Sequence, residues 1–256
     1  MITRKTPEQI DAMRRAGRLV GHTLSALVET VRPGITLLEL DRLAERTIRD
    51  GGGTPSFLGY HGFPATLCLS PNSWVVHGIP NGYVLSDGDI LSIDCGAIVE
   101  GWHGDAAVTL AIGTVAPADL ALSAACREAL DAGIAAVRPD ARLTDVSHAV
   151  QAAAEAAGRR DGSPYGIVEE YGGHGIGTSM HMDPFLPNHG APGHGPRLVV
   201  GMALAVEPML TGGGVETREL DDGWTVVTAD GSRAAHWEHS VAVTDDGPRI
   251  LTLPVD

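Results

Sequence analysis

The apolar residues in the first fifty positions recur at helical spacing in two segments. From Pro7 onward the apolar positions lie three or four residues apart, and Thr6-Pro7-Glu8-Gln9 has the form of a capping box with proline at the first helical position. This segment ends at Val31-Arg32-Pro33. A second capping box, Thr36-Leu37-Leu38-Glu39, opens an apolar face that ends at Gly51. The pattern predicts two consecutive helices.

The same plan returns in the second half of the chain. Helical spacing predicts a helix over 117–137 and another over 143–157, which ends at Gly158. The punctuation Val31-Arg32-Pro33 recurs as Val137-Arg138-Pro139, 106 residues later. Strand-like sequence follows each pair of helices.

Two helices followed by strands, twice, predict an α/β (α+β) fold built by duplication. The halves would be residues 7–112 and 117–250, packed about a pseudo-twofold axis within a single domain, 1–256. Coincidence is the alternative, because proline commonly ends helices. If the duplication is real, we expect a site where the sheets of the two halves meet.

In the stretch from Leu91 to Asp105, two apolar, β-branched runs flank a turn at Val99-Glu100-Gly101, which predicts a β-hairpin. Centred on that turn, Asp94 and Asp105 would lie opposite each other on one face. Two carboxylates side by side in a buried place repel each other, and a divalent cation between them is the simplest resolution. The alternative is a pair of solvated acids near a turn.

The second half supplies further metal-ligand candidates. His174 lies within Gly172-Gly173-His174-Gly175-Ile176-Gly177, where glycines allow close backbone approach, although a flexible loop with an exposed histidine has the same composition. A strand over 202–209 would place Glu207 on the face lined by small residues. A strand over 236–243 contains Glu238. Acids in strands also serve as edge gatekeepers, so each is weak evidence alone.

The five candidates together point to a dinuclear metal site. They comprise four carboxylates and one imidazole, namely Asp94, Asp105, His174, Glu207 and Glu238. A set without cysteine excludes a closed, thiolate-rich zinc site, and its hard oxygen donors favour Mn²⁺, Fe²⁺, Co²⁺ or Mg²⁺, with catalytic Zn²⁺ compatible. Four negative charges balance two divalent cations, which together activate water and polarise a carbonyl.

Composition narrows the class of protein. The net charge of −14 argues against general nucleic-acid or membrane binding, and no run approaches the ~18 apolar residues of a membrane span. The polar N-terminus lacks an apolar signal core, so secretion is not expected. Cys68, Cys95 and Cys126 form no CxxC pair and fit reduced thiols. We therefore expect a cytoplasmic protein.

With these motifs in order, nearly the whole chain resembles the type I methionine aminopeptidases. Besides the five candidates, the motifs that carry the resemblance are Tyr60-His61-Gly62, His77-Gly78-Ile79-Pro80, Val206-Glu207-Pro208, Asp222-Gly223-Trp224 and Trp237-Glu238-His239. The family implies the duplicated pita-bread fold, with a central curved sheet and helices outside. It also implies a cytosolic dimetal hydrolase that removes the initiator methionine from nascent chains when the amine is free and the second residue is small.

The resemblance also implies individual roles. Asp94 would bind one metal, His174 and Glu207 would hold the other, and Asp105 and Glu238 would bridge both. Glu207 would move a proton of the attacking water. His77 and His181 would contact the substrate amide and carbonyl. Without the resemblance, His77 is a turn residue and His181 a surface-loop histidine.

The resemblance further implies a methionine pocket, lined by Tyr60, Phe63, Cys68, Met180 and Trp224. Phe57, Phe63 and Met180 depart from many relatives, which carry Cys, Tyr and Phe at those positions. The pocket stays apolar and contains a thiol, so the preference for methionine should survive while its shape changes.

The expected cofactors are two divalent ions: Co²⁺, Mn²⁺ or Fe²⁺ first, with Zn²⁺, Ni²⁺ or Mg²⁺ also compatible. The expected partner is a nascent polypeptide or peptide, bound by a monomer, with transient ribosome contact left open. Two other functions stay open at this point. A proline-directed pita-bread peptidase shares the five ligands but usually carries an extra N-terminal domain, and a non-enzymatic pita-bread scaffold usually lacks ligands.

Overall fold

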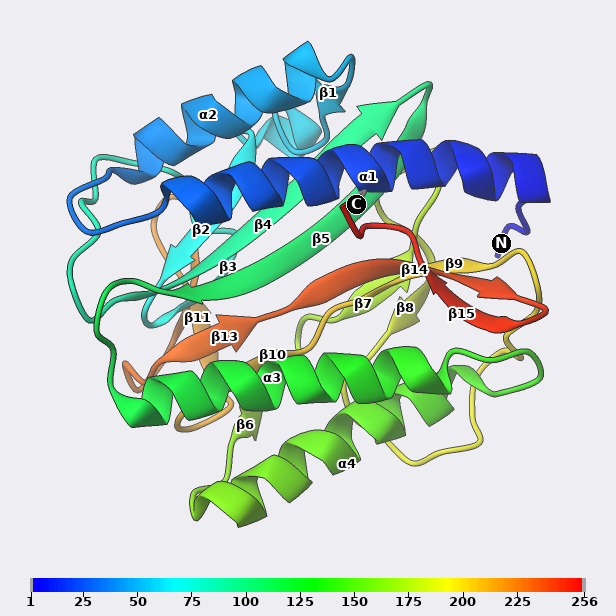
Figure 1. The fold of residues 1–256 in the computed structure, drawn as a ribbon. Helices are drawn as coiled ribbons and strands as arrows, with labels where there is room; N and C mark the ends of the chain where they lie inside the picture. The colour runs from blue at the N-terminus through cyan, green and yellow to red at the C-terminus, as the bar shows by residue number, and fades with distance from the viewer. Residues whose placement is uncertain (1, 255–256) are drawn as a thin grey trace.

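The computed structural model describes residues 2–254 and forms a curled antiparallel sheet with helices packed against it (Figure 1). Its helices are α1 (Pro7–Thr30), α2 (Leu37–Asp50), α3 (Pro117–Ala136) and α4 (Leu143–Asp161), with a short 3₁₀ turn at Tyr60–Gly62. Its strands are β1 (Thr54–Pro55), β2 (Leu67–Pro71), β3 (Trp74–Val76), β4 (Ile90–Val99), β5 (Trp102–Ala111), β6 (Gly166–Ile167), β7 (Gly173–Gly175), β8 (Met182–Leu186), β9 (Ala203–Val206), β10 (Met209–Thr211), β11 (Thr217–Glu219), β12 (Val226–Thr228), β13 (Ala234–His236), β14 (Glu238–Thr244) and β15 (Gly247–Ile250).

The helices begin where the local sequence predicts. Both expected capping boxes are formed, with Thr6 and Thr36 accepting from the backbone N–H three residues later at 3.3 and 3.2 Å. The predicted end of α4 at Gly158 is wrong, because the helix continues to Asp161 and is capped by Gly162 at φ 75°. Gly158 instead lets the returning chain pass close, since a Cβ there would lie 3.1 Å from the carbonyl of Ser163.

The main sheet has nine strands in the order β1-β4-β5-β14-β9-β7-β8, with β2 paired to β4 and β15 to β14. Smaller sheets, β13-β10-β6 and β11-β12-β3, flank it. Strands from the first and second parts of the chain therefore meet at the β5–β14 pair. The element order is two helices followed by strands, twice, whereas the division into homologous halves stays a prediction.

The hairpin of β4 and β5 is present, but its predicted register is wrong. The turn consists of Glu100 and Gly101 alone, both at positive φ (52° and 79°), as in a type I′ turn. Consequently Asp94 pairs with Ala107 and Asp105 with Gly96. The two aspartates are diagonal neighbours, and they still share one face because the shift is two positions.

Two predicted strands are also interrupted. The expected strand over 236–243 is broken at Trp237, so β13 belongs to a small sheet and β14 to the main one. The expected strand over 202–209 stops at Val206, and β10 resumes after Pro208. A strand that changes sheets here brings side chains of both sheets toward one place.

Within residues 2–254, the α-helices pack against one face of the main sheet. In β4 the residues Leu91, Ile93 and Cys95 pack in a core with α1 and α2. In β9 the residues Leu204 and Val206 pack with α3 and α4. Through the register of the intervening strands these residues all lie on the same face, and Figure 1 shows the two helix pairs side by side across it. The other face is left for a site.

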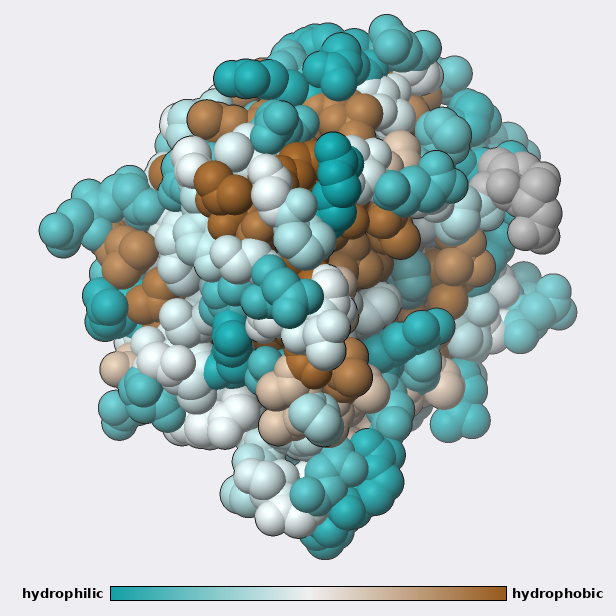
Figure 2. All heavy atoms as spheres, turned by 60° about the vertical axis from the view of Figure 1, so that its left-hand side comes forward, coloured by the Kyte–Doolittle hydropathy of each residue, from teal (hydrophilic) through white to brown (hydrophobic). Residues whose placement is uncertain are grey.

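The surface in Figure 2 mixes hydrophilic and hydrophobic residues, and the hydrophobic groups on this face are interrupted by hydrophilic ones. Within the described residues 2–254, the helices include none with the length and apolar character needed to cross a membrane.

Candidate metal centre

Two adjacent rows of residues across the helix-free face carry the candidate ligands. One row is Asp94, Ala107 and Glu238 on β4, β5 and β14. The next row runs over five strands and contains Gly96, Asp105, Ser240, Ala205 and His174. In both rows the residues beside the ligand candidates are Gly, Ala or Ser, with two of them, Ser240 and Ala205, between Asp105 and His174. These small neighbours leave open space above the sheet, into which the carboxylates and the imidazole extend.

Asp105 is held firmly by its neighbour on β14. The Asp105 N–H donates to the Ser240 hydroxyl at 3.0 Å, and that hydroxyl donates to the Asp105 carbonyl at 2.9 Å. The backbone is thus fixed on both sides while the carboxylate stays free. These backbone hydrogen bonds position Asp105 as a metal-ligand candidate without using its carboxylate oxygens.

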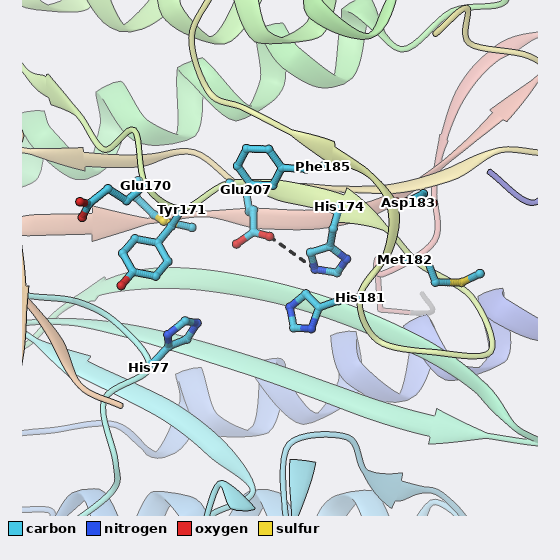
Figure 3. Close-up of a pocket in the computed structure, with 11 residues that line it drawn as sticks. His77, Glu170, Tyr171, His174, His181, Met182, Asp183, Phe185 and Glu207 are labelled. Carbon is cyan, nitrogen blue, oxygen red and sulfur yellow. Dashed lines mark ion pairs between the residues drawn. The ribbon is translucent and has the colours of Figure 1, made fainter. Parts of the chain in front are cut away.

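Glu207 lies directly after β9, where Pro208 ends the strand. Its carbonyl accepts a hydrogen bond of 3.0 Å from the Asn188 side chain, and its Oε1 lies 3.5 Å from His174 Nε2. His174 has its Nδ1 within 2.9 Å of the Gly175 carbonyl. Donation from Nδ1 leaves Nε2 free to bind a metal, the arrangement typical of histidine ligands. Figure 3 shows this pair, joined by a dashed line.

The carboxylates of this centre lack partners for several buried oxygens. Among the described residues, Asp94 Oδ1, Asp105 Oδ1 and Glu238 Oε1 are buried without a hydrogen bond. Burial raises the pKa of all four carboxyl groups, and neighbouring carboxylates raise those of Asp105 and Glu238 further. Unpaired buried oxygens of this kind fit divalent cations, which would replace the missing partners.

Donor atoms of five residues fall into two groups that share Glu238, and Asp94 belongs to neither group. Atoms of Asp105, His174 and Glu238 lie within 4.8 Å of one another, and so do atoms of Glu207, His236 and Glu238. Oxygen and imidazole donors suit Mn²⁺, Fe²⁺, Co²⁺ or Zn²⁺. Two groups joined at Glu238 are what a pair of cations bridged by a carboxylate requires.

His236 was missed by the sequence reasoning. The side chain of His236 is 2% exposed, and its Nε2 lies 3.5 Å from Glu207 Oε2. The available signal was its spacing of two from Glu238, which places both side chains on one face of an extended segment.

The two remaining candidate histidines lie at the mouth of the centre (Figure 3). The ring of His181 is 4.3 Å from that of His174 between centroids, and its Nδ1 shares a hydrogen bond of 2.8 Å with the Tyr60 hydroxyl. His77 adopts a left-handed backbone at φ 58°, which is uncommon outside glycine, although histidine adopts it more often than most other residues. Burial lowers the pKa of His77 to about 4 and also lowers the pKa of His181. Both rings are therefore neutral at pH 7.

An inner and an outer cavity meet at these residues. The inner cavity has a volume of about 140 Å³, and the outer one about 520 Å³. Both are lined by His77, His174, His181 and Glu207. The inner one contains the metal-ligand candidates, and the outer one opens toward solvent past Phe185, which is 54% exposed.

The expected pocket residues lie around the inner cavity with one difference. Tyr60, Phe63, Cys68 and Trp224 line it, and so does Phe57. Met180 is only 1% exposed, is not part of that lining, and packs in the core behind it. Burial and the neighbouring carboxylates raise the pKa of the Cys68 thiol, so it is neutral. Phe63 and Trp224 are in edge-to-face contact, with 5.1 Å between ring centroids. The wall is therefore apolar and aromatic.

Comparison with known proteins places this fold and centre in a family. The chain matches the model of metallopeptidase family M24 over residues 11–245. The chain belongs to this family, and its curled sheet with outer helices is the expected pita-bread fold.

Within the family, the similarity is to methionine aminopeptidases. The sequence is 59% identical over 254 residues to methionine aminopeptidase 1 of Mycobacterium tuberculosis (strain CDC 1551 / Oshkosh), covering 99% of this chain and 96% of that protein. The crystal structure of methionine aminopeptidase from Rickettsia prowazekii matches with a TM-score of 0.95 and 39% identity, over 99% of this chain and 100% of that one. The prolidase from Pyrococcus furiosus shares the fold (TM-score 0.78) at 19% identity, and this chain covers only 66% of it.

Proposed function

We propose that this protein removes N-terminal methionine from peptides and nascent proteins that have a free amine and a small second residue. The observation that carries the proposal is that the cluster of metal-ligand candidates opens directly into an apolar, aromatic inner cavity. A methionine side chain is unbranched, apolar and polarizable, and its sulfur makes favourable contacts with aromatic edges. The identity of 59% to a named methionine aminopeptidase supports the same assignment.

In this proposal the five expected ligands hold two divalent ions. Asp94 belongs to the first ion, His174 and Glu207 to the second, and Asp105 and Glu238 to both. Bound there, the ions would lower the pKa of a water molecule and polarise the scissile carbonyl. Co²⁺, Mn²⁺ and Fe²⁺ are the ions we expect, because the donors are oxygen-rich with imidazole.

Three residues of the chain would move the proton and bind the substrate. Glu207, whose pKa is raised by burial, accepts the proton of the attacking water and delivers it to the leaving amine. His181 has Nδ1 engaged by Tyr60, so its Nε2 is available to the substrate carbonyl. His77 lies across the pocket and would donate to the substrate amide (Figure 3).

Neither alternative function is favoured. Similarity to prolidases is limited to the fold at 19% identity, and this chain spans 66% of the prolidase length. A scaffold without activity has no need for unpaired buried carboxylates, which lower stability when empty. We propose a cytoplasmic monomer that acts on chains as they leave the ribosome.

The test is a panel of peptides compared by kcat/KM. We expect cleavage of Met-Ala, Met-Gly and Met-Ser peptides, and poor cleavage of Met-Lys or Met-Phe because the substrate would lie in a cleft between the two packed halves of the chain. An apolar pocket discriminates one methylene by only about 10–200-fold, so norleucine should be partly accepted. Equal rates on Met-Ala and Lys-Ala, cleavage of formyl-Met-Ala, or preference for a Xaa-Pro peptide would overturn the proposal.

A further inference from the structure

One buried imidazole outside the five expected ligands faces the same carboxylates. His236 Nε2 lies 3.5 Å from Glu207 Oε2 and 3.9 Å from Glu238 Oε2. It is buried and has no hydrogen-bond partner among the described residues. A buried ring nitrogen without a hydrogen-bond partner is costly, and this one is directed at the carboxylate groups of two metal-ligand candidates.

The backbone of His236 is fixed in a way that sets this direction. The His236 N–H donates to the Thr109 hydroxyl at 2.9 Å, and that hydroxyl donates to the His236 carbonyl at 2.8 Å. These two hydrogen bonds hold the backbone of His236 in place. Thr109 belongs to β5, the strand that also carries Asp105. His236 is the last residue of β13, immediately before the chain crosses from the small sheet to the main sheet. The imidazole is thus anchored to the same strand as one of the metal-ligand candidates.

The distances match donors around a shared cation better than a hydrogen bond. An N–H···O hydrogen bond spans about 2.7–3.2 Å between heavy atoms, which is shorter than either separation. Donors at about 2.0–2.2 Å from a tetrahedral or octahedral ion lie about 3.0–3.5 Å from each other. The Glu207 carboxylate has His174 Nε2 at 3.5 Å from one oxygen and His236 Nε2 at 3.5 Å from the other. Its two oxygens therefore have equivalent imidazole neighbours.

We propose that His236 is a sixth protein ligand of the metal centre and binds through Nε2 the ion held by Glu207 and Glu238. This inference rests on the proposed function in so far as it takes the inner cavity to be a dinuclear centre. A neutral imidazole adds a donor without changing the charge balance of four carboxylates and two divalent ions. The added nitrogen shifts the preference of this ion toward Co²⁺, Fe²⁺ or Zn²⁺ and away from Mg²⁺.

The experiment counts metal-bound imidazoles by NMR of protein labelled with ¹⁵N-histidine, stripped of metal and then loaded with Zn²⁺. We expect two Nε2 resonances, those of His174 and His236, to show coordination shifts. In His236→Gln one of them should disappear, and calorimetry should show one of the two Zn²⁺ sites weakened about 10–100-fold. The metal-binding calorimetry is repeated with Co²⁺.

The matched control is His239→Gln, on the strand that follows. The His239 Nδ1 shares a hydrogen bond of 2.8 Å with the Thr252 hydroxyl, and the residue pairs with Ala106 on the helix-covered face. This variant should keep both coordination shifts and both affinities. His181→Gln should also keep both shifts, which separates His236 from the other histidine near the ions.

Each outcome decides the question. A single coordinated imidazole in the unmodified protein overturns the inference even if His236→Gln fails to fold, and so does unchanged Zn²⁺ affinity in a folded His236→Gln. Cleavage of Met-Ala by the unmodified protein is measured on the same sample. Normal cleavage with only one coordinated imidazole would overturn the assignment of His236 as a ligand and leave the proposed function in place. Two coordinated imidazoles without methionine removal would contradict the proposed function while leaving the ligand assignment in place.

Discussion

The two faces of the main sheet use the same strands for opposite purposes. On the helix-covered face, Leu91, Ile93 and Cys95 of β4 are 0% exposed and packed against α1 and α2. On the other face, Asp94 of the same strand and Asp105 of the next carry buried oxygens without partners. Alternation along one strand thus separates a well-packed core from a polar cavity by a single residue.

This difference shows where stability comes from and where it is given up. The helix-covered face buries apolar side chains, which stabilises the fold. The cavity face holds like-charged groups close together, which destabilises the fold unless cations are present. Function and stability are therefore assigned to alternate residues, and substitutions on the two faces should have different consequences.

The largest effect is expected on the cavity face, at the residue proposed to bridge both ions. Asp105→Ala removes a shared ligand and leaves the other carboxylates repelling one another. We expect turnover of Met-Ala-Ser to fall by at least ~10³-fold, on the scale of a lost electrostatic stabiliser or more, with fewer bound ions. Metal analysis and steady-state kinetics measure both. Two ions bound with a normal rate would refute the bridging role.

A smaller loss is expected at the mouth of the cavity. His181→Ala should lower turnover by ~10²–10³-fold, because the substrate carbonyl loses a hydrogen-bond donor in the transition state. The protein should still bind two ions, since His181 is proposed to contact substrate only. Loss of metal together with the side chain would show that this division between ligand and substrate contact is mistaken.

Adjacent substitutions on β4 sharpen the comparison of the two faces. In chelator at pH 8, Ile93→Val should lower the free energy of unfolding by about 0.5–1.5 kcal/mol through lost packing, without weakening metal binding. Asp94→Asn should instead raise it by about 1 kcal/mol, because it removes a buried charge, while metal binding is lost. Denaturant unfolding checks both. A stabilising effect of Ile93→Val or a destabilising effect of Asp94→Asn would break the comparison.

The smallest effect is the pH dependence of the difference in free energy of unfolding between Asp94→Asn and the unmodified protein. Burial raises the pKa of Asp94 in the metal-free folded state, so its contribution to stability is present at low pH and is lost as pH rises through the folded pKa. The advantage of Asp94→Asn over the unmodified protein should thus already be present at pH 5, which lies above the ordinary pKa of an aspartate, and should grow until the pH passes the folded pKa of about 7. A difference independent of pH would show that Asp94 is not the group that titrates.

The helices could be predicted from sequence because their signals are local. Thr6 and Thr36 each cap a helix through residues three positions away, so no distant contact is needed. The end of α4 was misplaced because Gly158 serves a tertiary contact with the chain near Ser163 rather than a helix stop. A local reading cannot separate these two uses of glycine.

The site could be predicted only in part, for a related reason. The shared face of Asp94 and Asp105 follows from alternation, but their pairing depends on which residues form the turn, and Glu100 adopts a positive φ that its type does not favour. His236 was missed because its approach to Glu207 depends on the chain crossing between sheets at Trp237. Such crossings are set by packing of the whole molecule.

The central claim is that the unpaired carboxylates hold two divalent ions that methionine removal requires. The direct measurement strips the protein with chelator, confirms metal loss, and titrates Co²⁺ or Mn²⁺ while following binding by calorimetry and cleavage of Met-Ala-Ser. The account predicts no cleavage in the stripped protein, binding of two ions, and activity that returns as they bind. Full activity in excess chelator, with metal loss confirmed, would contradict it.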